Sequence, residues 1–230
     1  MGLFLDVMGI IGRNDVDVES SLKNYLNSVS GGLEISDIDS SHKNFCVIES
    51  KKSNTTIFYP AYFTDWYACS QFISKDLITT VFSCHIHDGD LWMYTMYVNG
   101  EIKDRFCPIP DYWDENISQD EIESWIGDAE ILAKHVPGLE IKNIEKYLVK
   151  WYLDKEEQKA YPDDEFTNCD WQLVDFLKKL DLPYPIDNEG HARGKIFKMW
   201  TKDFPLDENP IPRDGYIVGP STKKTWWKFW

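Results

Sequence analysis

VFSCHIHDGDLWMYTMYVNGEIKDRFC, residues 81–107, decides the fold, because it contains two dipeptides that favour tight β-turns. They are Asp88-Gly89 and Asn99-Gly100. Both central positions of a type I′ turn need a positive φ, which Asp, Asn and Gly tolerate best. Two such turns would connect three antiparallel strands. The sequence therefore predicts a three-stranded meander.

If both turns are two residues long, the register of the meander follows by counting. The predicted pairs are His87–Asp90, His85–Trp92, Ser83–Tyr94, Val98–Glu101, Met96–Lys103 and Tyr94–Arg105. Side chains alternate between the two faces of a sheet. One predicted face is apolar core, with Asp104 as the single misfit; the other is free to contact a partner and carries Ser83, His85, His87, Asp90, Trp92, Tyr94, Met96, Glu101, Lys103 and Arg105. On this register, replacing Trp92 with alanine should barely change stability, whereas Met93→Ala should cost ~2–5 kcal/mol.

The composition is that of a folded, strongly acidic protein. The 230 residues are 43% hydrophobic and 15% aromatic, with ten Trp, and their net charge is −15. Such a charge repels nucleic acid and anionic membranes, so we expect neither as a partner and favour a basic protein. The five cysteines are scattered and odd in number. They predict reduced thiols in the cytoplasm, with neither a disulfide framework nor a cysteine zinc motif. No cofactor is expected.

The rest of the first half alternates helical and strand patterns. Strands are predicted at 3–8, 33–38, 44–49 and 55–59, and helices at about 17–29 and 65–77. This order predicts an α+β fold: a ferredoxin-like antiparallel sheet, extended by the meander, with helices on one face.

The composition changes after Pro108 and predicts a C-terminal helical annex. The capping box Ser118–Glu121 opens a helix that should run to Val136. Two more helices are expected at about 141–151 and 170–180, and a short strand or turn at 190–202. The predicted division is a sheet domain at 1–110, a helical annex at 111–183 and an irregular, docked tail at 184–230. The tail ends in the aromatic and basic residues 223–230, for which docking on the body is favoured.

One group of residues suggests a metal site. His85, His87 and Asp90 supply two imidazoles and a carboxylate within one hairpin, and Zn²⁺ accepts both ligand types. The simpler interpretation is a solvated cross-strand pair beside a turn. No glycine-rich phosphate loop, nucleophile elbow or zinc-protease motif accompanies the group. A metal-assisted hydrolase is therefore the second hypothesis, and a structural or regulatory protein is the third.

Acidic residues that alternate with aromatic ones favour a binding function. Tyr112 and Trp113 lie between carboxylates, and such a surface combines anchors with steering toward a cationic partner. Together with the polar sheet face, the predicted contact residues are His85, His87, Asp90, Trp92, Tyr94, Arg105, Asp111, Asp114, Glu115, Asp163 and Asp164. In composition and architecture the chain resembles the small, acidic, Trp-rich immunity proteins with which bacteria block toxins. The leading hypothesis is therefore a non-enzymatic, immunity-type inhibitor of a basic protein.

Overall fold

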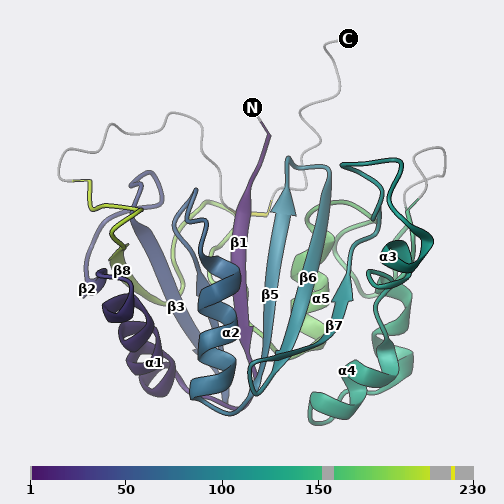
Figure 1. Cartoon of the computed structure of the whole chain (residues 1–230), viewed down its shortest axis with the longest axis horizontal. Helices are drawn as coiled ribbons and strands as arrows, with labels where there is room; N and C mark the ends of the chain where they lie inside the picture. The colour runs from purple at the N-terminus through teal and green to yellow at the C-terminus, as the bar shows by residue number, and fades with distance from the viewer. Residues whose placement is uncertain (1, 152–157, 208–218, 221–230) are drawn as a thin grey trace.

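The structure is a computed structural model that describes residues 2–151, 158–207 and 219–220 (Figure 1). Its centre is an open antiparallel sheet of eight strands in the order β2-β8-β3-β4-β1-β5-β6-β7. The strands are β1 (Leu5–Ile10), β2 (Gly32–Ile35), β3 (Phe45–Lys51), β4 (Asn54–Phe58), β5 (Thr80–His87), β6 (Leu91–Val98), β7 (Glu101–Phe106) and β8 (Lys195–Trp200). The fold is α+β, as predicted. The predicted contact of the C-terminal residues 223–230 falls outside the described residues.

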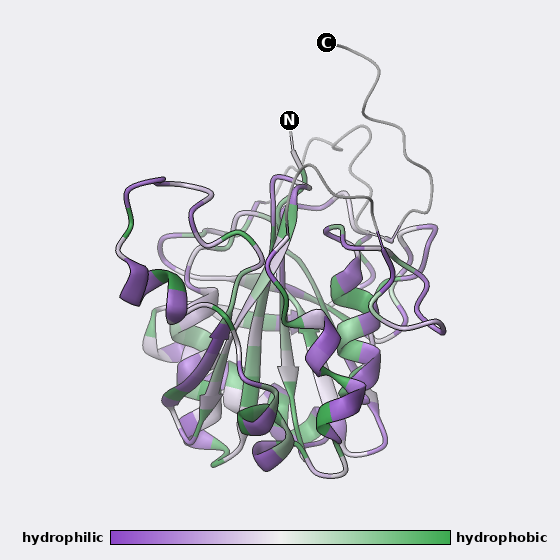
Figure 2. Ribbon diagram, turned by 90° about the vertical axis from the view of Figure 1, so that its right-hand side faces the viewer, coloured by the Kyte–Doolittle hydropathy of each residue, from purple (hydrophilic) through white to green (hydrophobic). Residues whose placement is uncertain are grey.

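Helices lie on both faces of the sheet. On one face α1 (Asp15–Ser28) and α2 (Trp66–Asp76) pack against alternate residues of the strands, such as Met8 of β1. On the other face α5 (Gln172–Lys179) packs against the residues in between, such as Val7. The strands between these helices carry much of the hydrophobic sequence, and many outer loops are hydrophilic (Figure 2). Most strand residues are therefore buried whichever way they point.

The first turn of the meander is one residue longer than predicted. Asp88 and Gly89 both have positive φ, and the Asp90 amide donates to the His87 carbonyl, so the expected tight turn is present. Strand pairing, however, resumes between His87 and Leu91, which leaves Asp90 as an extra residue. His85 therefore pairs with Met93 and not with Trp92. The predicted faces of β6 are wrong, because one extra residue moves every side chain of a strand to the opposite face.

The second turn has the predicted length, but β7 then bulges. Val98 pairs with Glu101 as expected, and the register shifts between Met96 and Tyr97. Beyond the bulge Met96 pairs with Asp104, so the predicted pairing of Met96 with Lys103 is wrong. The bulge explains the misfit in the pattern: Asp104 lies on the α5 face, where the Tyr94 hydroxyl donates to its carboxylate at 2.5 Å.

Asp104 should make stability depend on pH. Burial raises the pKa of its carboxyl to about 6, so the folded state binds this proton more tightly than the unfolded chain does. Stability should therefore fall as pH rises from about 4 to above 6, by about 2 kcal/mol from this partly buried group. Asp104→Asn should remove that part of the fall, as measured by urea unfolding across this range, whereas the exposed Asp114→Asn should not. Parallel curves for wild type and Asp104→Asn would contradict the assignment.

The segment predicted as one long helix is two short ones. The Ser118 side chain accepts from the Glu121 amide and caps α3 (Gln119–Glu123), as the capping box predicts. Gly127 then adopts a positive φ, and Asp128 caps a separate α4 (Ala129–His135). The next predicted helix is replaced by two 3-10 turns, η1 (Ile141–Asn143) and η2 (Glu145–Tyr147). The helical spacing of the apolar residues did not reveal that the helix is interrupted at Gly127.

The C-terminal part contributes to the sheet as well as to the helices. α5 lies within its predicted range, and β8 forms around Ile196, where a strand or turn was expected. β8 inserts between β2 and β3, so residues 195–200 belong to the sheet and not to an irregular tail. The domain boundaries at 110 and 183 stay a prediction. Within the described part of the chain, no helix has both the length and the apolarity needed to cross a membrane.

Candidate functional site

A chain of hydrogen bonds runs from the sheet to the surface at one end of β5. Asp6 of β1 is the cross-strand partner of His85, so both side chains lie on the α2 face. The Asp6 Oδ1 atom is 2.7 Å from His85 Nδ1, and His85 Nε2 is 3.2 Å from His87 Nδ1. The Trp113 indole Nε1 donates to His87 Nε2 at 3.2 Å. The four side chains thus form one continuous chain.

The direction of every hydrogen bond in this chain follows from its outer end. An indole nitrogen only donates, so His87 Nε2 must accept and carries no hydrogen. In neutral His87 the hydrogen is then on Nδ1, which donates to His85 Nε2. His85 in turn carries its hydrogen on Nδ1 and donates to the Asp6 carboxylate. Both histidines are therefore neutral, each in a single tautomer.

Aromatic rings surround the two histidines. Trp66, in the first turn of α2, stacks on His85 with ring centroids 5.1 Å apart and an angle of 9° between the planes. Phe4 meets His87 edge to face at 5.0 Å. Tyr112 meets the same imidazole edge to face at 5.7 Å. These contacts fix the orientation of both imidazoles and limit their access to water.

The surface end of the chain is a patch that we call the acidic aromatic rim, made of Asp90, Tyr112, Trp113, Asp114 and Glu115. Trp113 is 52% exposed and Tyr112 is 37% exposed. The Tyr112 hydroxyl donates to Asp90 Oδ2 at 2.6 Å. All three carboxylates are exposed. The rim therefore presents two aromatic side chains, held by specific hydrogen bonds, among carboxylates.

The electrostatics differ between the buried and exposed ends. Burial raises the pKa of the Asp6 carboxyl, and the contact with His85 opposes that rise. Burial lowers the pKa of His87, which the charges of Asp88 and Asp90 partly offset. The hydrogen bond to Asp90 is the main cause that raises the pKa of the Tyr112 hydroxyl to about 12. At neutral pH the rim is therefore anionic and His87 is uncharged.

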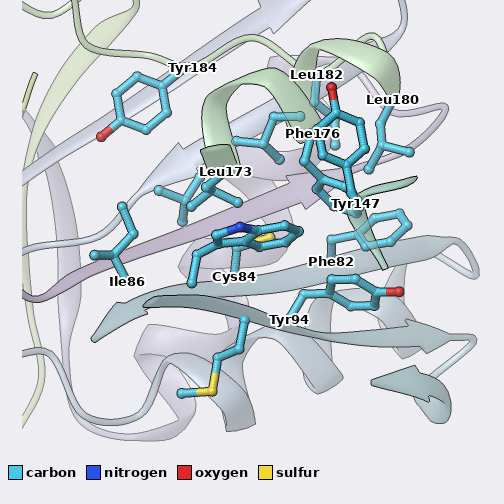
Figure 3. Packing of buried hydrophobic residues seen from close by; sticks show 14 of the residues in the cluster. Phe82, Cys84, Ile86, Tyr94, Tyr147, Leu173, Phe176, Leu180, Leu182 and Tyr184 are labelled. Carbon is cyan, nitrogen blue, oxygen red and sulfur yellow. The ribbon is translucent and has the colours of Figure 1, made fainter. Parts of the chain in front are cut away.

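Several predicted contact residues lie in the core. Trp92 and Tyr94 are fully buried under α5, and Figure 3 shows Tyr94 near Phe82 and Phe176 in this cluster. They are on the α5 face because of the extra residue at the first turn. They cannot contact a partner at the surface of this fold, so their predicted role is wrong.

The remaining predicted residues are divided between the rim and other parts of the molecule. Arg105 is half-buried, with its guanidinium 5.3 Å from the centre of the Trp125 ring. Asp111 pairs with Lys150 at 3.3 Å. Asp163 pairs with Lys179 at 2.9 Å.

Asp164 has a structural role. It is 4% exposed and accepts from the Tyr147 hydroxyl at 2.6 Å and from the Tyr161 amide at 2.8 Å. Its carboxylate therefore holds the annex together and does not face solvent. The prediction that it contacts a partner is wrong.

The proposed metal ligands do not form a metal site. Both nitrogens of His85 and both of His87 already have hydrogen-bond partners, and Asp90 accepts from Tyr112. Across residues 2–151, 158–207 and 219–220, no group of three or more His, Cys, Asp or Glu side chains is arranged to hold a metal ion. The geometry gives the hydrolase hypothesis no support.

Three members of the site, Asp6, Trp66 and Phe4, were absent from the sequence-based prediction. Asp6 lies 79 residues before His85 in the sequence and Trp66 lies on a different element. A carboxylate within an otherwise apolar strand is a signal for Asp6, because buried acids need a partner. No pattern in the sequence points to Trp66, which looks like an ordinary residue of an amphipathic helix.

Comparison with known proteins adds no relative. No protein-family model matches the chain, and no curated protein or solved structure is significantly similar to it.

Proposed function

We propose that the chain is a protein-binding module that uses the acidic aromatic rim to bind a basic protein. The observation that carries this proposal is Trp113, a large aromatic side chain that is half-exposed and yet held in place through its indole nitrogen. Trp and Tyr side chains dominate binding energy at protein interfaces. An anchor that is already ordered loses little entropy on binding.

The charge around the anchor selects the type of partner. Asp114 and Glu115 are exposed, and neither makes an ion pair with any residue that the structure describes. The chain as a whole carries −15. This field accelerates association with a cationic protein and disfavours acidic ones. In the form we favour, the chain is a bacterial, cytoplasmic, immunity-type inhibitor, and its partner is a basic toxin.

We also propose a ferredoxin-like core within the larger sheet. The elements β1, α1, β3, β4, α2 and β5 occur in this sequence order, with β2 between α1 and β3, and their strands lie in the order β3-β4-β1-β5. Both helices lie on the same face of these strands. This order and the placement of the helices support the assignment. On this view β6, β7 and the annex are additions that carry the rim, and β2 and β8 extend the opposite edge of the sheet.

The proposed function predicts a partner whose capture depends on the rim and on salt. Immobilised protein should enrich a basic protein from a lysate at low ionic strength and lose it at high ionic strength. The double variant Asp114→Asn, Glu115→Gln should bind that purified protein roughly tenfold more weakly, because two steering charges are lost.

The matched control removes two charges at the opposite edge of the sheet. Glu34 and Asp37 are exposed, and Glu34 lies on β2, the edge strand farthest from β7. Glu34→Gln with Asp37→Asn should leave the affinity nearly unchanged. Equal weakening by both pairs, or capture only of partners insensitive to salt, would refute a rim-centred function. It would favour a structural or regulatory role.

A further inference from the structure

The hydrogen-bond chain beneath the rim has a bare nitrogen at its surface end. His87 Nε2 accepts from Trp113 and so holds Trp113 only while it carries no hydrogen. We propose that a proton entering this chain releases Trp113 from His87, so that the anchor of the rim is held at neutral pH and freed in acid. This inference concerns the regulation of the rim, and its consequence for partner binding rests on the proposed function.

Counting hydrogens shows why the proton must arrive at that nitrogen. The chain has two inner contacts, Asp6–His85 and His85–His87, and each holds one hydrogen between its two heavy atoms. A second hydrogen in either contact would force two donors together. Among the atoms that take part in these hydrogen bonds, His87 Nε2 is therefore the one that can accept the additional hydrogen, whether the positive charge stays on His87 or moves inward to neutralise Asp6. In both cases Nε2 becomes a donor that faces the Trp113 indole N–H.

The charged groups around His87 set where this change occurs. His85 faces it from β5, Asp88 and Asp90 from the turn, and Asp6 acts through His85. Phe4 and Tyr112 pack against the imidazole as uncharged rings at neutral pH. Burial and His85 oppose protonation, whereas Asp88 and Asp90 favour it. Together these effects lower the pKa of His87. We therefore expect the hydrogen bond from Trp113 to His87 to be present at pH 7 and to break at acidic pH.

Release should be local. Tyr112 is tied to Asp90 by a bond that does not involve a histidine. Trp113 is already 52% exposed, so its side chain can turn outward without unfolding the core. A freed indole must be ordered again on binding. The protonated hydrogen-bond chain also carries one more positive charge. Both changes lower the affinity for a cationic partner.

NMR tests the pH-dependent release of Trp113 from His87 without any partner. The indole N–H resonance of Trp113 is assigned by its loss in Trp113→Phe and is followed from pH 8 to pH 4.5 together with the His87 ring resonances. Both should titrate with one midpoint, and the protection of the indole hydrogen, which is the intrinsic exchange rate at each pH divided by the measured rate, should fall at least tenfold on acidification. A His87 titration that leaves the indole resonance unchanged would overturn the proposal. Protonation of the second carboxyl oxygen of Asp6 while His87 Nε2 carries no hydrogen would overturn it too.

Two substitutions at His87 distinguish the effect of protonating His87 from other effects of acidic pH on the protein. His87→Gln supplies an amide oxygen that accepts at every pH, so the indole should remain protected in acid. His87→Ala should show tenfold faster exchange already at pH 8, which decides the matter even if acid unfolds the protein first. The exposed His191→Gln is the control and should titrate as wild type. Because no partner is added, failure here leaves the binding test of the rim unaffected.

Discussion

Replacing Trp92 with alanine is expected to destabilise the fold by about 3–5 kcal/mol. Its side chain is fully buried. Its ring lies 4.8 Å from that of Phe176 and 5.1 Å from that of Phe106, centroid to centroid. Its indole nitrogen donates to Gln172 Oε1 at 3.3 Å. Alanine would leave a cavity between β6 and α5 and would remove the partner of a buried amide, and both effects act in the same direction.

The measurement is chemical denaturation of Trp92→Ala beside Trp113→Ala. Trp113 is half-exposed, so its replacement should cost about 1 kcal/mol or less. Thermal unfolding should show the same order, with a fall of roughly 8–15 °C for Trp92→Ala in a domain of this size. A loss of only about 1 kcal/mol or less for Trp92→Ala, as expected for an exposed side chain, would mean that the side chains of β6 face the other way. The predicted register with a two-residue turn would then be correct after all.

Replacing Asp6 with alanine is the second change with a large expected effect, about 3 kcal/mol of stability. The carboxylate is buried in β1 and is the acceptor for His85 Nδ1. Removing one member of a buried pair leaves the other polar group without a partner in a medium that solvates it poorly. His85 would then lose the contact that selects its tautomer, so the effect should reach Trp113 as well.

Asp6→Asn is the matched control for this prediction. Its amide oxygen can still accept from His85, so its loss of stability should be less than half that of Asp6→Ala. Urea unfolding at pH 7.5 measures both variants. Equal losses would show that the charge of Asp6, and not its role as acceptor, stabilises the site.

The sequence predicted the class of the fold better than its details. Asn99-Gly100 forms the expected turn, and the strand pattern of the first half gives the antiparallel sheet. Asp88-Gly89 also adopts positive φ, but the additional residue Asp90 shifts the pairing by one. Nothing in β6 could reveal that shift, because its sequence LWMYTMYV is apolar or aromatic apart from Thr95 and residues 91–97 are buried. A strand covered on both faces has no alternation that marks its inner side.

The candidate site was predictable only in part, for a related reason. His85 and His87 are polar residues at the end of a strand, and local sequence draws attention to them. Their partners Asp6 and Trp113 come from distant parts of the chain, and only the fold brings them together. The metal hypothesis rested on the spacing of His85 and His87 along one strand and assumed that their ring nitrogens were free to bind a metal. In the structure these nitrogens are already used by the hydrogen-bond chain.

The central claim is that the rim binds a basic partner through Trp113. Its most direct test is the Kd of the purified partner for wild type and for Trp113→Ala, each measured across a series of salt concentrations at pH 7.5. We expect Trp113→Ala to weaken binding about 30-fold, equivalent to about 2 kcal/mol. The slope against salt should be unchanged, because the substitution removes an anchor and no charge. Unaltered affinity in Trp113→Ala, or binding in wild type that does not weaken with salt, would contradict the account.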